Sequence, residues 1–260
     1  MRIVIKMVVC LFLIACTHQS AFAASKFGKP QTADFSNEDV IDGFNKTVFG
    51  SEYSNRNKNF KIHVKKFRKP IRLYVNNFIG TKYKKIEERI KNFVVYIPYA
   101  NIKIVKKKSK ANAFIHLFPN DDKKVRNYLG ALSIKGRLSK QGRRNVENFQ
   151  CALKLRIDKR YNIYRTHAFV FADQYWPYYL PCLTEEFMQS LGPVNDDESL
   201  KYSIFADGPA YSRLQLFDVY ILNMLYHPKI RAGMRKKDVQ PILPAILEEV
   251  KATLRPLLEN

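Results

Sequence analysis

A short amphipathic segment with a sharp stop, residues 181–197 (PCLTEEFMQSLGPVNDD), most constrains how this chain can fold. Leu183, Phe187 and Leu191 recur at helical spacing and predict one apolar face. Gly192 is followed by a proline, which cannot continue a helix, whereas glycine readily takes the left-handed conformation of a C-terminal cap. The segment therefore predicts a helix that buries one face and ends at residue 192.

The rest of the chain alternates between the period of strands and the period of helices. Strands are predicted at 71–75, 102–105, 113–118, 151–157 and 163–171, and helices at 36–50, 82–97, 214–226 and 238–258. Ser36 and Asp39 have the spacing of a capping box at the start of the first helix. This order predicts an α+β domain with a small twisted mixed sheet and C-terminal helices.

Domain boundaries follow from composition. Residues 24–35 read as a flexible leader, and residues 121–149 read as a polar surface excursion without a sustained period. No linker or internal repeat divides the remainder, so residues 36–260 are predicted to form one domain.

Along the helix predicted at 214–226, side chains are expected to face alternately inward and outward.

Residues 1–23 have the composition of an export signal. Basic residues precede an apolar run, MVVCLFLIAC, that is too short to span a bilayer. Residues 21–23 (AFA) fit ordinary secretion, whereas residues 13–16 (LIAC) resemble a bacterial lipobox that would place a lipid on Cys16. Both readings predict a mature protein outside the cytoplasm, in the periplasm, secreted, or attached to the outer membrane only through Cys16.

Cysteine usage agrees with export. Cys151 and Cys182 are the pair that remains after the signal region. In an oxidising compartment such a pair is expected to form a disulfide, here between the start of a strand and the start of the helix at 181–192. Two buried free thiols are the alternative.

Several clusters resemble the uncharacterised bacterial family known as domain of unknown function 2927. They are residues 182–196, residues 203–207, Asp218 with Leu222 and Leu225-Tyr226, and Gly233-Met234. The resemblance covers most of the mature chain and implies no known activity. Some members of that family look like lipoproteins, which favours a lipid on Cys16.

The helix at 181–192 also has the spacing of the metzincin zinc-protease signature, H-E-x-x-H-x-x-G-x-x-H. Glu185, Gln189 and Asn195 stand at the three histidine positions, and only Glu186 and Gly192 match the signature. This more distant resemblance implies a zincin-like fold, in which a twisted sheet covers a cleft and the signature helix forms its floor.

The donor chemistry at these positions disfavours zinc. A catalytic zinc ion needs three protein ligands, most often histidine nitrogens, and without it Glu186 has no activated water to use. Glu185, Gln189 and Asn195 offer oxygen, which suits a hard cation such as calcium better. We therefore expect no zinc site and no required cofactor, and a non-catalytic binding or structural module. The alternative is a peptidase-like hydrolase that uses Glu186 with non-standard metal ligands.

The histidines do not restore a zinc site, since His63, His116, His167 and His227 are scattered along the chain. Each of them reads as an ordinary strand or surface histidine.

Carboxylates gather around the helix at 181–192. Five of them, Glu185, Glu186, Asp196, Asp197 and Glu198, fall within fourteen residues of a chain that is otherwise basic. The simple interpretation is a solvated helix face. If the helix floors a cleft, that cleft is acidic and suits calcium, magnesium or a cationic group of a ligand.

The opposite charge dominates elsewhere, because the formal net charge of the chain is +22. Residues 56–110 contain 18 lysines and arginines against two glutamates, Glu87 and Glu88. Such a stretch predicts contact with anionic lipid, lipopolysaccharide or wall polymers. The export signal argues against nucleic acid as the partner, and a generic soluble surface remains the plain alternative.

Overall fold

The computed structural model describes residues 28–50, 58–79, 83–118, 151–171, 176–206 and 211–259. The predicted signal with Cys16 and the polar excursion at 121–149 lie outside these residues. Within these ranges, no helix combines the length and the apolar composition needed to cross a bilayer.

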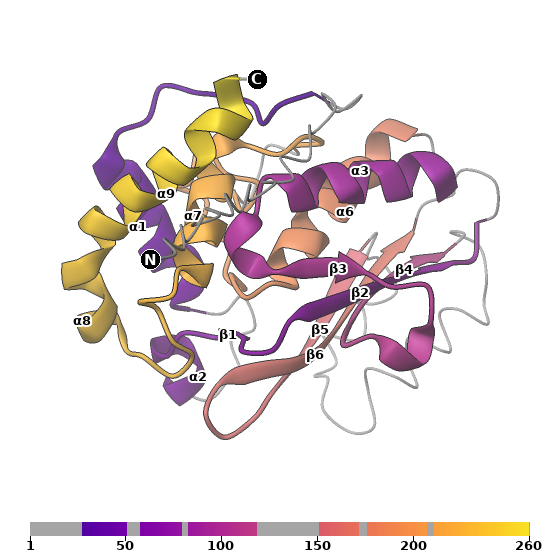
Figure 1. Cartoon of the computed structure of the whole chain (residues 1–260), viewed down its shortest axis with the longest axis horizontal. Coiled ribbons are helices and arrows are strands. Elements are labelled where there is room, and N and C mark those ends of the chain that lie inside the picture. The colour runs from indigo at the N-terminus through magenta and orange to yellow at the C-terminus, as the bar shows by residue number, and fades with distance from the viewer. Residues whose placement is uncertain are drawn as a thin grey trace, which may run out of the picture.

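A mixed sheet forms one half of the described molecule (Figure 1). Its strands are β1 (Lys66–Phe67), β2 (Ile71–Asn77), β3 (Ile102–Ile104), β4 (Ala113–Phe118), β5 (Cys151–Ile157) and β6 (Asn162–Phe171). The order β1-β6-β4-β2-β3 is parallel throughout, and β5 pairs antiparallel with β6. The predicted α+β class with a mixed sheet is confirmed, and so is the predicted β5–β6 hairpin.

The helices form two groups in Figure 1. Over one face of the sheet lie α3 (Tyr83–Val95) and α6 (Trp176–Gln189). Beside the sheet gather α1 (Asn37–Val48), α7 (Leu216–Tyr226), α8 (Lys236–Val239) and α9 (Leu243–Glu259), which confirms the C-terminal helices. The short elements are α2 (Lys58–Ile62), η2 (Pro98–Ala100), η3 (Lys108–Lys110) and η4 (Gln240–Ile242).

The capping box at the start of α1 forms as the sequence predicts. The Ser36 Oγ accepts a hydrogen bond from the amide of Asp39 at 3.1 Å, and the Asp39 carboxylate accepts one from the amide of Ser36 at 2.8 Å. Two amides that the helix itself leaves unpaired are thereby satisfied.

The predicted alternation of α7 between inward and outward faces is wrong. Ten of its eleven residues are buried, because α1, α9 and η2 pack around it. A helix that is apolar on all sides has to lie inside the protein, since no face of it suits water. The nearly continuous apolar sequence of α7 therefore indicates a helix at the centre of the protein.

Two predicted boundaries also change. The helix predicted from Pro181 begins at Trp176, so Pro181 lies inside α6, which packs on β5 and β6. The predicted leader is held in place from residue 28 onwards. Gln31 exchanges backbone hydrogen bonds of 2.8 Å with Leu214 and Leu216, on the approach to α7. The packed domain therefore begins before residue 36.

Candidate functional site

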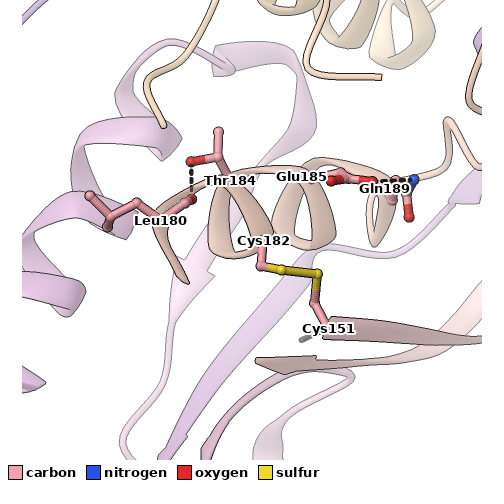
Figure 2. The surroundings of a disulfide bond; sticks show 6 residues. All are labelled: Cys151, Leu180, Cys182, Thr184, Glu185 and Gln189. Atoms are coloured by element: carbon pink, nitrogen blue, oxygen red, sulfur yellow. Dashed lines mark hydrogen bonds between the residues drawn. A yellow bond between two sulfur atoms is a disulfide. The ribbon is translucent and has the colours of Figure 1, made fainter. Parts of the chain in front are cut away.

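The polar side of α6 gathers three of the predicted site residues. The Gln189 Nε2 donates a hydrogen bond to the Asp196 Oδ1 at 2.9 Å. It also makes a longer contact of 3.5 Å with the Glu185 Oε1, which Figure 2 shows. Gln189, which stands at a zinc-ligand position of the protease signature, thus donates hydrogen bonds to Glu185 and Asp196. These three side chains form a local polar cluster.

The other two predicted residues are placed differently. Glu186 is only 5 % exposed, within the core that α6 shares with its neighbours. The Asn195 Nδ2 donates to the backbone oxygen of Lys46 at 2.9 Å, at the end of α1, and the side chain packs against Gly50. Asn195 is therefore engaged with α1 and not with the cluster around Gln189.

The last residue of α6 is Gln189, and Gly192 closes the turn that follows it, for two physical reasons. Its φ of +134° lies in a region that residues with a side chain rarely adopt. A Cβ at this position would also collide with the backbone oxygen of Lys65, just before β1. The predicted stop is confirmed, and the structure adds the close approach of another chain segment.

The predicted disulfide is present. Cys151, at the start of β5, is bonded to Cys182 in α6, with 5.7 Å between the two Cα atoms (Figure 2). It joins the antiparallel strand to the helix that follows the sheet. The polar cluster therefore sits on a helix that is covalently fixed to the sheet.

The structure pairs two histidines that are far apart in sequence. The His116 Nε2 on β4 lies 3.0 Å from the His167 Nδ1 on β6, and the rings of Phe114 and Phe169 stack against them. Burial lowers the pKa of His116 to about 3 and that of His167 to about 4. Both rings are therefore neutral at neutral pH, and one donates a hydrogen bond to the other.

His116 and His167 are far apart in the sequence, but they are neighbours in the fold, because β4 and β6 are adjacent parallel strands. Within the described ranges, no group of three or more histidine, cysteine, aspartate or glutamate side chains could hold a metal ion.

Three segments that are distant in sequence meet at one end of the molecule. The amide of Val64 donates to the oxygen of Met234 at 2.9 Å, and the amide of Gly233 donates back to Val64 at 2.9 Å. Lys66 pairs with Asn162 where β1 joins β6. We call this region the basic end and define it as residues 58–69, 158–162 and 227–237.

The charge of the basic end is almost entirely positive. Its three segments contain 13 lysines and arginines and one acid, Asp158. The Asp158 carboxylate is used locally, since it accepts hydrogen bonds from the amides of Arg160 and Asn162 and from the Asn162 side chain. The hydrogen bond from the Asn162 side chain is the main reason that the pKa of Asp158 is lowered.

A cavity of about 480 Å³ opens at the basic end. Arg68, Lys69, Arg160 and Arg231 line it as exposed cations, and none of the lining residues, all of them described, is acidic. The rest of the lining combines aromatic rings, such as Tyr99, with amide side chains and apolar atoms. An anion is the ligand that such a lining would attract.

Lys66 forms the buried part of this cavity and is 9 % exposed. Its ammonium donates to the backbone oxygens of Leu225 at 2.8 Å and Ile230 at 2.9 Å, and it lies 5.1 Å from the centre of the Tyr226 ring. A cation is favourable here because the carbonyls at the C-terminal end of α7 carry partial negative charge. Burial nevertheless lowers the pKa of Lys66 to about 8.

A buried asparagine fixes the part of the cavity wall that η2 provides. The Asn223 Nδ2 on α7 donates to the oxygen of Tyr96 at 2.8 Å, and its side-chain oxygen accepts from the amide of Tyr99 at 3.4 Å. These bonds hold η2 against α7, so that Tyr99 and Asn101 border the cavity.

The basic stretch at 56–110 gave a partial signal for this cavity, but nothing in the sequence linked that stretch to Arg160 or Arg231.

Fold and site together define a disulfide-bonded α+β domain with a mostly parallel mixed sheet, C-terminal helices and a basic cavity at one end. The chain belongs to the family described as "Protein of unknown function (DUF2927)", whose family model matches residues 37–245. No curated protein and no solved structure matches the chain.

Proposed function

We propose that this protein works outside the cytoplasm as a non-catalytic module that binds a phosphate-bearing membrane surface of the cell envelope through its basic end. The observation that carries the proposal is the convergence of 13 cationic residues and one acid from three distant segments. Each lysine or arginine near an anionic membrane surface contributes about 1 kcal/mol of binding free energy. Lys65 and Lys66 are buried and Lys229 is paired with Glu249, but the ten other cations of the basic end are exposed or half-exposed, which is enough for stable attachment.

Exposed apolar groups at the same end favour a membrane over a soluble polymer. Ile62 in α2 is 38 % exposed and Tyr164, near the start of β6, is 52 % exposed. Tyr164 follows Ile163, which pairs with Phe67 in β1. Large side chains that are exposed beside cations suit the boundary between lipid head groups and acyl chains.

The non-catalytic part of the proposal rests on α6. If the fold is zincin-like, α6 takes the place of the signature helix, because it follows β6 at the end of the sheet. Gln189 then stands where a zinc ligand would be, and its amide nitrogen faces Asp196 instead. Glu186, the residue that would act as catalytic base, is 5 % exposed. A peptidase assay that compares the wild type with Glu186→Gln tests this part separately.

Membrane binding is tested by co-sedimentation with phosphatidylglycerol vesicles. Lys236→Gln/Lys237→Gln changes two exposed lysines of the basic end. It should weaken binding by about 2 kcal/mol, or roughly thirtyfold. The matched control is Lys106→Gln/Lys107→Gln, which changes two exposed lysines that follow β3 at the edge of the sheet.

The two double variants should differ clearly. The control should bind nearly as the wild type does, and wild-type binding should fall as salt is raised, since exposed charges are screened. Equal loss in both variants would mean that overall charge, and not the basic end, drives binding. Binding to wall polymer without binding to vesicles would refute the membrane as the partner.

A further inference from the structure

We infer that the cavity at the basic end is a binding site for a phosphomonoester group carried on a polar group about the size of one sugar ring. The inference rests on the proposed function and specifies which group of the envelope surface enters the protein. It uses residues that the zinc-protease resemblance does not include.

The charges that line the cavity favour a phosphomonoester over a singly charged anion. Three arginines, Arg68, Arg160 and Arg231, reach it from three different segments. Arginine presents a planar fork of donors that matches phosphate oxygens, and its charge is permanent. A monoester carries close to two negative charges at neutral pH, so it gains more from several cations than a carboxylate or a phosphodiester does.

The buried charge of Lys66 strengthens this preference. Its hydrogen-bond acceptors in the structure are backbone carbonyls, which carry no net charge. No carboxylate is among the residues that line the cavity in the described part of the chain. An anion in the cavity would supply the missing negative charge in a region of low polarity, where the attraction is strong.

Size and lining extend the inference beyond the phosphate itself. A volume of about 480 Å³ lies within the usual range of pockets that enclose small organic ligands, roughly 300–1,000 Å³. Asn101 and Asn162 add amide groups next to the cations, and Tyr99 adds a ring. Amides orient a ligand through hydrogen bonds to its hydroxyl groups. The cavity thus has room and polar groups for a hydroxyl-rich carrier of the phosphate.

The test is calorimetric titration of the wild-type protein with glucose 1-phosphate, inorganic phosphate and glucose. Glucose 1-phosphate should bind more tightly than inorganic phosphate, and glucose should give no heat. Arg68→Gln/Arg231→Gln should weaken binding of glucose 1-phosphate by about tenfold or more, as expected for lost charge-assisted hydrogen bonds. Both arginines are exposed, so a thermal unfolding curve should confirm that this variant still folds.

The matched control is Lys106→Gln/Lys107→Gln, which changes two exposed lysines outside the basic end and outside the cavity lining. It should keep the wild-type affinity for glucose 1-phosphate. A second arm compares vesicles that contain phosphatidic acid, a phosphomonoester lipid, with phosphatidylglycerol vesicles of equal charge. If the bound group belongs to a lipid, the wild type prefers phosphatidic acid and Arg68→Gln/Arg231→Gln loses that preference.

The possible failures are distinguishable. In the first, the wild-type protein binds vesicles but neither glucose 1-phosphate nor inorganic phosphate, and shows no preference for phosphatidic acid over phosphatidylglycerol. That result would overturn the cavity inference and leave the membrane function intact. Equal binding of glucose and glucose 1-phosphate would overturn the phosphate preference. Binding of glucose 1-phosphate without any binding to vesicles would refute the membrane function and support the cavity as a site for a soluble phosphorylated compound.

Discussion

Removal of the Cys151–Cys182 disulfide should destabilise the domain by an amount that follows from the length of the loop it closes. The two cysteines are 31 residues apart. The chain-entropy relation gives about 12 cal/mol/K for a loop of this length, or about 3.7 kcal/mol at 25 °C. For a domain of this size, such a loss should lower the Tm by roughly 7–15 °C, at about 2–4 °C per kcal/mol.

The measurement is urea-induced unfolding of the wild type, Cys151→Ala, Cys182→Ala and the double variant. Either single substitution already breaks the cross-link. The two single variants and the double variant should therefore lose nearly equal amounts of unfolding free energy, which is strong non-additivity. Wild-type protein unfolded in the presence of a reductant should behave similarly. Losses that simply add, or equal stability with and without reductant, would refute the reasoning.

Three further predictions concern buried positions. Gly192→Ala should cost about 3 kcal/mol or more of unfolding free energy, because it adds backbone strain and a steric collision. The control Gly233→Ala, where a Cβ would lie 3.2 Å from the nearest atom, should cost less by the same denaturation assay. Burial raises the pKa of Asp218 to about 7, so its protonated form is favoured in the folded state. The wild type should therefore lose stability relative to Asp218→Asn as the pH rises from 4 to 8, and an unchanged difference between the two proteins would contradict this. Because the pKa of Lys66 is about 8 and a bound anion favours its charged form, affinity for glucose 1-phosphate should fall as the pH rises from 7 to 9.5. A flat calorimetric profile over that range would exclude Lys66 as a contributor.

Predictions that depend on neighbours in sequence were the accurate ones. The capping box at Ser36 joins residues three apart, and the turn between β5 and β6 joins adjacent strands. The stop of α6 shortly before Gly192 follows from the preferences of glycine and proline themselves. The pairing of Cys151 with Cys182 followed from the small number of candidate thiols. In each case the constraint is local or has very few alternatives, so the sequence is sufficient.

The errors came from positions where packing decides. Pro181 does not begin α6, because contacts with β5 and β6 outweigh the missing amide hydrogen of a proline. Residues of the predicted leader lie against α7, since Phe35 packs edge-on against Phe217 with 5.2 Å between ring centres. The environment of a segment in the folded protein overrides its intrinsic preference at such positions.

The sequence by itself determined the α+β class, most of the strands and helices, the disulfide and the excess of positive charge. Those properties depend on local periodicity, on composition and on one pair of cysteines. Only the tertiary structure decided that α7 is the central helix, that His116 meets His167 across two strands, and that Arg68, Arg160 and Arg231 surround one cavity. These residues are separated by long stretches of chain, so no sequence period links them. Their proximity follows from the strand order and from the contacts of β1 with the C-terminal end of α7.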